Sequence, residues 1–257
     1  MGWNYTDWNG SFYPKQTAMR DTLGVYSRAF DAVEIDSTFY GTPRVPQVQR
    51  WYQTTPAHFL FCPKVPRLLT HDMGLRDIEV PLRNFFETLA HLKEKRGAIL
   101  FQMPPSFGRE NLDALEELLP RLDSLRTGEE QFAFEFRNRT LIGSEVSEML
   151  RTYSVARVAA DYVGMPRRFE ITADFVYMRL IGRHGDFEQH KTTQRDRASE
   201  IDTWAKVLIA NQEAYQRAFV FCNNDYEGYS PATCNRLQER LGLQSKPAPQ
   251  EIQGSLF

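Results

Sequence analysis

Seven short apolar runs recur along this chain, and amphipathic stretches with helical spacing lie between them. The runs have the length and the β-branched or aromatic content of strands, and they cover residues 32–37, 59–65, 98–103, 132–137, 156–161, 175–181 and 218–223. The helical stretches cover residues 17–29, 44–54, 81–96, 111–122, 144–153, 199–217 and 231–241. Strands that alternate with helices are typical of a parallel sheet covered by helices. The order of elements therefore predicts an α/β protein.

The number of strands and the length of 257 residues together favour a (β/α)8 barrel, with an eighth strand at the very start of the chain. Two irregularities are expected. Only the stretch GMPRRFEITADF separates the sixth and seventh strands, which is too short for a full crossover helix. Few residues precede Trp3, so strand 1 is curtailed. We expect one irregular TIM-like barrel over residues 1–243, with a short or missing helix between strands 6 and 7, followed by a flexible tail at 244–257.

Composition excludes several classes of protein. The chain is 42% hydrophobic and 25% charged, with a net charge of −2, so no basic field attracts nucleic acid or an anionic membrane. No stretch approaches the ~20 apolar residues of a membrane span, and the start MGWNYTDW lacks the regions of a signal peptide. Cys62, Cys222 and Cys234 are widely spaced and are expected to be free thiols. These features favour a cytoplasmic protein.

Alternation within each strand separates a side that faces the helices from a side that faces the interior. The bulky apolar positions are assigned to the helix side: Val33, Ile35, Phe61, Val65, Ile99, Phe101, Phe132, Phe134, Phe136, Val176, Met178 and Leu180. By elimination, the interior side near the strand ends receives polar residues: Glu34, Asp36, Lys64, Gln102, Glu135, Arg137, Asp161 and Arg179, with Asn223 or Asn224 after the last strand. Active sites of parallel barrels lie at this end of the strands.

The charged interior has two interpretations. Burying a charge is costly unless it is paired, so the residues either bind a ligand or neutralise one another in a structural network. As a ligand site, Lys64, Arg137 and Arg179 would hold carboxylate or phosphate groups. Glu34 or Glu135 would act as general acid or base, with Asp161 or His71 as a partner.

Two segments near this end of the strands have ambiguous roles. The loops at 67–79 and 182–197 contain His71, His184 and His190, which are candidates for acid–base chemistry or are simply solvated. The aromatic cluster of GWNYTDWNGSFYP at residues 2–14 would stack on a sugar or base, or plug one end of the barrel.

Several segments together resemble the YecE-like family, a bacterial domain of unknown function. They are GWNYTDWNGSFYP, VEIDSTFYGTP, RWYQTTPAHFLFCPKVPRLLTH, ILFQMPPSF, FAFEFRN, YMRLIGRHG and FVFCNND, in this order from Gly2 to about Leu243. The resemblance implies a TIM barrel and supplies no activity. It implies characteristic polar positions at Glu34, Thr38, Tyr40, Lys64, His71, Gln102, Glu135, Arg137, Arg179, His184 and Asn223. Relatives usually carry an apolar strand before the Gly-Trp pair, whereas Met1 directly precedes it here, so strand 1 is curtailed or the start codon is assigned too late.

The tail QSKPAPQEIQGSLF ends in two bulky apolar residues after a polar, proline-containing stretch. Gln253, Leu256 and Phe257 resemble the motif with which bacterial proteins dock on the replicative sliding clamp, although Gly254 stands where leucine is usual. The alternatives are that Leu256 and Phe257 pack back on the folded domain, or that the match arises by chance.

Three functions are consistent with these patterns. The first is an enzyme, a hydrolase, lyase or isomerase, that uses carboxylate acid–base chemistry on a small polar or anionic substrate, with Asp36, Tyr40, Gln102, His184 and Asn223 among its binding residues. The second is a metal-dependent phosphodiesterase or DNA-repair nuclease recruited to the clamp. The third is a non-catalytic ligand-binding protein. We expect no cofactor; five histidines leave room for at most a single divalent metal.

Overall fold

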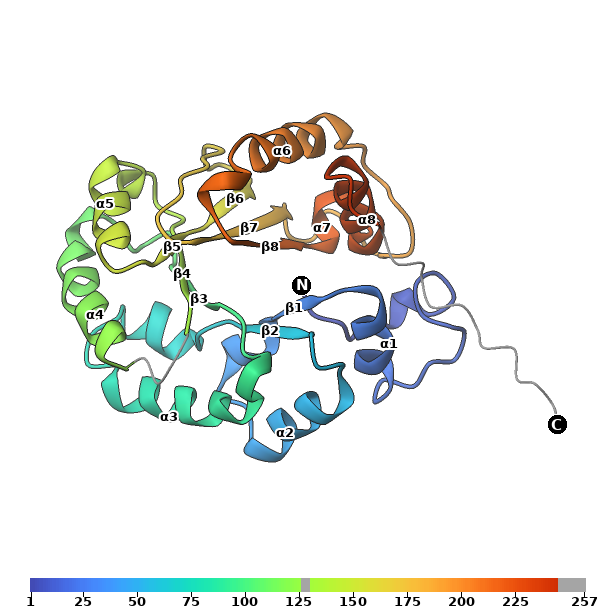
Figure 1. Cartoon of the computed structure of the whole chain (residues 1–257), viewed down its shortest axis with the longest axis horizontal. Coiled ribbons are helices and arrows are strands. Elements are labelled where there is room, and N and C mark those ends of the chain that lie inside the picture. Colours follow the sequence, from blue (N-terminus) through green and yellow to red (C-terminus); the bar gives the residue numbers. More distant parts are fainter. Residues whose placement is uncertain (126–129, 245–257) are drawn as a thin grey trace.

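The computed structural model describes residues 1–125 and 130–244. Its strands are β1 (Ala32–Ile35), β2 (Leu60–Pro63), β3 (Ile99–Gln102), β4 (Phe132–Glu135), β5 (Ala156–Arg157), β6 (Ala159–Tyr162), β7 (Phe175–Gly182) and β8 (Arg217–Cys222). Its α-helices are α1 (Thr22–Ala29), α2 (Val45–Thr54), α3 (Glu79–Leu89), α4 (Leu112–Leu125), α5 (Ser144–Thr152), α6 (Ala198–Ala210), α7 (Asn224–Glu227) and α8 (Ser230–Arg240). The helices lie around the strands in Figure 1.

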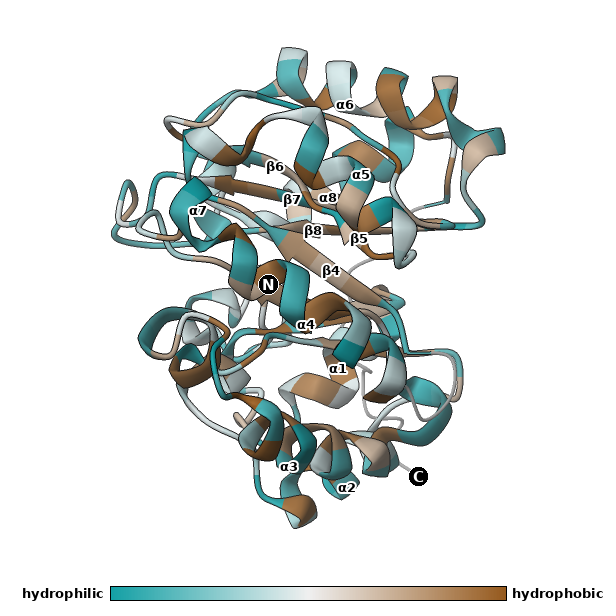
Figure 2. Ribbon diagram, turned by 90° about the vertical axis from the view of Figure 1, so that its left-hand side faces the viewer, coloured by the Kyte–Doolittle hydropathy of each residue, from teal (hydrophilic) through white to brown (hydrophobic). Residues whose placement is uncertain are grey.

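The predicted division of each strand into two sides is confirmed for the apolar residues. Phe101, Phe132 and Phe134 are fully buried in the large core that α1–α5 cover. Met178 and Leu180 are buried in a second core beneath α6 and α8. Figure 2 shows apolar residues along the strands and on one side of the helices. Burial of this apolar surface is the main force that stabilises the arrangement.

The prediction of a closed barrel is wrong. The strands form three separate parallel sheets, with the orders β1-β2, β3-β4-β5 and β6-β7-β8. Most strands have only four residues, which limits the ladder that each can form with its neighbours. The eighth strand expected at the start of the chain is also absent, because no strand precedes Ala32 in the described part. Residues Thr6–Trp8 form a short 3-10 helix instead.

The first two sheets are joined by isolated contacts. Phe61 bridges Arg96 and Lys64 bridges Leu100, both in parallel geometry. Gly97 permits this approach, because a Cβ atom there would lie 2.7 Å from Sγ of Cys62 and 3.2 Å from the carbonyl oxygen of Phe61. A side chain at position 97 would therefore push β2 away from the start of β3.

The fifth predicted strand is divided at Val158. β5 pairs with β4, whereas β6 pairs with β7. The prediction that no full helix separates the next two strands is confirmed, because residues 163–174 contain no helix. One helix was missed: α7 follows β8 directly and contains only four residues.

The aromatic cluster near the N-terminus belongs to the core. Trp8, Phe12 and Tyr13 are almost completely buried, and they pack beside Tyr26 of α1 and Phe30 at its end. These rings therefore pack in the core, although the end of a closed barrel that they were expected to plug does not exist in this structure. Among the described helices, none has the length and apolar character needed to cross a membrane.

Candidate functional site

Arg179 on β7 joins two buried carboxylates, Glu34 and Glu135, that lie far apart in the sequence. Its Nη2 donates to Oε1 of Glu34 at 2.7 Å, and its Nη1 donates to Oε2 of Glu135. Glu34, Glu135 and Arg179 are all at most 3% exposed. A buried guanidinium that serves two carboxylates forms strong, charge-assisted hydrogen bonds. This Glu34–Arg179–Glu135 triad is the centre of the charged interior predicted from the sequence.

Two further groups donate hydrogen bonds to the carboxylates of the triad, whereas Nε of Arg179 is buried without a partner among the described residues. The hydroxyl of Tyr177 donates to Oε2 of Glu34 at 2.8 Å, and Nε of Arg137 donates to Oε1 of Glu135 at 2.7 Å. Burial alone would raise the pKa of Glu135, but Arg179 and Arg137 lower that pKa to about 2. Glu135 is therefore ionised throughout the neutral range.

The three triad residues come from three separate sheets, Glu34 from β1, Glu135 from β4 and Arg179 from β7. Gln102 lies opposite Glu135 in the β3–β4 pair. Tyr177 was missed in the sequence analysis, although a signal existed. It is two residues from Arg179 on one strand and therefore points to the same side. Met1 also contacts the triad, because its Sδ accepts from Nη2 of Arg179 at 3.4 Å. No sequence pattern indicated this contact.

Asp36 and Lys64 lie beside the triad and differ from it, because neither side chain has an ion-pair or hydrogen-bond partner among the described residues. Burial and the charge of Glu34 raise the pKa of Asp36, although the N-terminal ammonium, Arg179 and Lys64 oppose this effect. Burial and the charge of Arg179 lower the pKa of Lys64 to about 8. Asp36 retains contact with solvent, and Lys64 is 8% exposed.

An aromatic ring and an imidazole surround the Lys64 ammonium. Its Nζ lies 3.9 Å from the centre of the Phe39 ring, which is a cation–π distance. The ring of His71 meets the same Phe39 edge-on, with centroids 5.0 Å apart. Burial and the charges of Lys64, Arg67 and Arg137 lower the pKa of His71 to about 4. His71 is therefore a neutral hydrogen-bonding group at pH 7.

Thr38 fixes the backbone that presents Lys64. Its Oγ1 lies 2.7 Å from the carbonyl oxygen of Lys64 and 2.8 Å from that of Ile35, and it accepts from the Lys64 amide at 3.0 Å. Thr38 is 1% exposed. The hydroxyl thus ties the ends of β1 and β2 together at the edge of the site.

We expect Thr38→Val to lower the free energy of unfolding by about 1–3 kcal/mol, because it leaves buried backbone groups without their partner while keeping the side-chain shape. Urea denaturation of the variant measures the change. Thr152→Val is the control, since the Thr152 hydroxyl bonds an exposed helix carbonyl. Equal losses in the two variants would contradict the structural role of Thr38.

The prediction that Asp161 faces the same interior is wrong. Its Oδ2 accepts from Nε1 of Trp204 at 3.0 Å, from the Tyr226 hydroxyl at 2.8 Å and from Nε of Arg167 at 3.0 Å. In the register of the sheet, Ala160 is the partner of Arg179, so Asp161 points to the side of α6. Asp161 anchors helices to the sheet and is not a partner of Glu34 or Glu135.

In the part of the chain that the structure describes, the other predicted binding residues take no part in the hydrogen bonding of the triad. Gln102 is buried, and its Nε2 donates to the carbonyl oxygen of Met103. Asn223 caps α7 and lies 3.7 Å from Sδ of Met1. The His184 side chain is fully exposed and lies 3.2 Å from Asp225, and Tyr40 is 86% exposed. Gln253, Leu256 and Phe257 lie outside the described residues.

No group of three or more His, Cys, Asp or Glu side chains in the described residues is arranged to hold a metal ion. The carboxylates of the triad are instead occupied by guanidinium groups. The cationic side chains of this region could therefore bind an anion next to a carboxyl group.

Comparison with known proteins identifies the relatives of this chain. A family model described as "Protein of unknown function DUF72" matches residues 1–254. The chain is 33% identical to the UPF0759 protein YecE of Escherichia coli K12 over 127 residues, which is 49% of this chain and 45% of that protein. It is 25% identical to the UPF0759 protein YunF of Bacillus subtilis 168 over 98% of this chain and 96% of that protein. The YecE alignment thus spans less than half of that relative, whereas the YunF alignment spans nearly all of it.

Two crystal structures share the fold. A DUF72 family protein from Thermotoga maritima MSB8 superposes with a TM-score of 0.76 at 26% identity, covering 92% of this chain and 94% of that one. A DUF72 family protein from Enterococcus faecalis V583 superposes with a TM-score of 0.73 at 22% identity, covering 89% and 96%. These matches confirm the resemblance to the YecE-like family.

Proposed function

This chain belongs to the DUF72 family of proteins of unknown function, and we propose that it is an enzyme that moves a proton on a small anionic substrate. Lys64 binds the anionic group of the substrate, and Asp36 is the general acid or base. The Glu34–Arg179–Glu135 triad is the rigid, charge-balanced support on which these two groups are mounted.

One observation carries this proposal. Asp36 and Lys64 are oppositely charged neighbours without ion-pair partners among the described residues, and the pKa of each is shifted toward neutrality. Acid–base catalysis is most efficient when the pKa of the catalytic group lies near the working pH. Groups perturbed by burial and by specific charges are concentrated at functional sites.

The general acid or base in this proposal is Asp36, and not Glu34 or Glu135 as the sequence suggested. Arg137 and Arg179 hold the pKa of Glu135 at about 2, and Glu34 accepts hydrogen bonds from Arg179 and Tyr177. A carboxylate held at so low a pKa by two cations, as Glu135 is, is a poor proton carrier near pH 7. Within the part of the chain that the structure describes, Asp36 has no such partner, and its pKa is raised.

Neighbouring side chains supply the remaining contacts to a substrate. Arg137 is partly exposed and stacks on Tyr162, with its Cζ 4.3 Å from the ring centre, so its guanidinium is held in place beside the triad. Such a guanidinium binds carboxylate or phosphate oxygens in a fixed geometry. The neutral His71 offers a hydrogen bond beside Lys64.

Sulfate binding tests the anion site, because the charge of sulfate does not change between pH 7 and pH 9. We expect sulfate to bind the wild-type protein at pH 7 and at least tenfold more weakly at pH 9, since Lys64 loses its proton near pH 8. Lys64→Met removes this binding at both pH values. Isothermal titration calorimetry measures the affinities.

The control variant is Lys206→Met, which removes an exposed ammonium from α6 and keeps the wild-type affinity. Sulfate that binds Lys64→Met as tightly as it binds the wild type would contradict the assignment of Lys64. A binding constant that is the same at pH 7 and pH 9 would contradict it as well.

A non-catalytic ligand-binding protein is the second candidate, and the self-paired triad favours it, because paired charges need no chemical role. This protein would bind anions through Lys64 and show no turnover in a screen of small carboxylates and phosphate esters. The metal-dependent nuclease recruited to a sliding clamp stays a prediction; the described residues offer it no cluster of metal ligands, and its docking motif lies outside them.

A further inference from the structure

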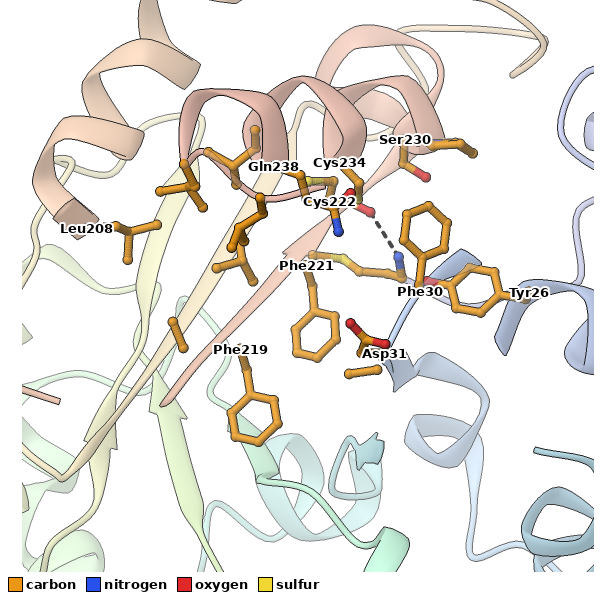
Figure 3. A pocket seen from close by; sticks show the side chains of 18 of the residues that line it. Tyr26, Phe30, Asp31, Leu208, Phe219, Phe221, Cys222, Ser230, Cys234 and Gln238 are labelled. Atoms are coloured by element: carbon orange, nitrogen blue, oxygen red, sulfur yellow. Dashed lines mark hydrogen bonds between the residues drawn. The ribbon is translucent and has the colours of Figure 1, made fainter. Parts of the chain in front are cut away.

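A cavity of about 440 Å³ lies along β8, between α8 on one side and α1 with the start of β1 on the other. Its walls are mainly apolar, and they include Phe30, Leu208, Phe219, Phe221 and Leu237. Figure 3 shows Phe219 and Phe221 on one side of β8 and Gln238 on the other. Neither Asp36 nor Lys64 is among the described residues that line the cavity, so it is separate from the charged site.

Two polar side chains of this wall carry a buried atom that is not hydrogen-bonded. Nε1 of Trp8 and Oε1 of Gln238 have no partner among the described residues. Trp8 is 1% exposed and ends the short helix Thr6–Trp8, whereas Gln238 belongs to α8. Buried polar atoms in native proteins nearly always have a partner, because leaving one unbonded costs free energy. The cavity wall therefore contains one unused donor and one unused acceptor.

The charged groups in the described part of this wall already have partners. The Met1 amino group donates to the carbonyl oxygen of Cys222 at 2.9 Å. The carboxylate of Asp31 lies 3.4 Å from Nε2 of His58, and 64% of the Asp31 side chain is exposed to solvent. An ionic ligand would lose its hydration in the cavity without gaining an unpaired charge of opposite sign. A neutral molecule therefore suits the cavity better than an ion.

Aromatic rings in the wall favour a ligand that contains a ring. Phe219 and Phe221 lie nearly parallel, with an angle of 11° between their planes and 6.5 Å between their centroids. The rings of Trp8 and Tyr26 also belong to the wall, and they are parallel within 9° at 6.4 Å. Aromatic side chains provide large apolar contact areas and pack well against other rings.

We propose that this cavity binds an uncharged, mainly apolar small molecule with an aromatic or alicyclic body and a hydroxyl group. The volume lies in the range of ~300–1,000 Å³ that is typical of small-molecule sites, which combine apolar walls with a few polar groups. The ligand oxygen accepts from Nε1 of Trp8, and the hydroxyl group donates to Oε1 of Gln238. A hydroxyl group is both a donor and an acceptor, so it matches both unused atoms of the wall. This site is independent of the proton transfer proposed at Asp36.

Two related compounds, 2-naphthol and 2-methoxynaphthalene, test the role of Gln238. Both carry an oxygen acceptor on the same ring system, and only 2-naphthol donates a hydrogen bond. We expect the wild-type protein to bind 2-naphthol about tenfold more tightly at pH 7, since one buried hydrogen bond is gained. In Gln238→Met the two affinities become equal, whereas Gln53→Met, at an exposed position on α2, keeps the preference. Isothermal titration calorimetry measures the affinities.

A variant that fills the cavity tests the location of the site. Ala218 lines the cavity and is exposed, so a larger side chain there reaches into the cavity without entering the core. We expect Ala218→Trp to weaken the binding of both compounds by about tenfold or more, because close packing leaves them no room. Ala57→Trp, at an exposed position before β2, keeps the wild-type affinities. Circular dichroism confirms that each variant is folded.

Three results would overturn the proposal. They are equal affinities of the wild-type protein for the two compounds, a preference for 2-naphthol that persists in Gln238→Met, and unchanged binding to Ala218→Trp. An affinity that falls with rising protein concentration would also overturn it, since a second copy of the chain would then cover the cavity.

Discussion

Replacing Arg179 with methionine is expected to lower the free energy of unfolding by about 3–5 kcal/mol, the usual cost of removing one partner of a buried ion pair. Arg179 is the cation that contacts both Glu34 and Glu135, and all three residues are almost fully buried. The variant leaves the Glu34 carboxylate with the Tyr177 hydroxyl and leaves Glu135 with Arg137. Urea denaturation at pH 7 measures the loss.

The pH dependence of the same variant gives a second, independent readout. In the wild type, the pKa of Glu135 is lowered to about 2, so its stabilising contribution is fully present above the ordinary pKa of 4.5 and is lost as the pH falls toward 2. In Arg179→Met the pKa of Glu135 rises. We therefore expect the stability gap between wild type and variant to narrow below pH 4.5.

Two controls separate loss of charge pairing from loss of volume. The triple variant Arg179→Met/Glu34→Gln/Glu135→Gln removes the unpaired charges and recovers much of the lost stability. Arg240→Met breaks the exposed pair with Asp202 and leaves stability unchanged. If the triple variant were as unstable as Arg179→Met alone, packing rather than charge would be the function of Arg179.

The second large effect is expected at Asp36. A screen of small carboxylates and phosphate esters by NMR identifies a compound that the wild-type protein converts. We expect Asp36→Asn to lower the rate of that conversion by ~10²- to 10⁴-fold, the usual contribution of a general acid or base. The amide keeps the size of the side chain and loses its ability to carry a proton.

The pH profile of the wild-type rate assigns the two groups. As a general base, Asp36 acts above its raised pKa, so the rate increases with pH from a midpoint above the ordinary value of 3.8. The rate decreases again near pH 8, where Lys64 loses its charge. Lys64→Met abolishes this alkaline decrease and raises the midpoint of the acidic limb, because it removes a cation that lowers the pKa of Asp36.

Asp174→Asn, an exposed aspartate before β7, is the matched control and keeps the wild-type rate. An Asp36→Asn protein that retains its full rate would remove Asp36 from the mechanism. If no compound in the screen is converted while sulfate still binds through Lys64, the binding protein becomes the better description.

Most strands and helices were predictable because their signals are local. An apolar–polar alternation over four residues requires no knowledge of distant partners, and it located β1, β4 and β7 within one or two residues. The split at Val158 and the helix α7 were missed, since a single-residue break and a four-residue helix carry too little pattern. The closed barrel was wrong because the number of strands does not determine which strand edges pair.

The sequence by itself determined that Glu34, Lys64, Glu135 and Arg179 face the interior, although it assigned Asp161 to the wrong side. The position of Glu34, Lys64, Glu135 and Arg179 in their strands follows from a period of two, which is a property of the backbone. Tertiary structure alone decided how those charges are used. Arg179 meets Glu34 across 145 residues of sequence, and this pairing leaves Asp36 and Lys64 without an ion-pair partner in the described part of the chain. The bulge between Asp161 and Tyr162 accompanies the turn of Asp161 toward α6. Pairing depends on the relative placement of distant strands, and no local pattern contains that information.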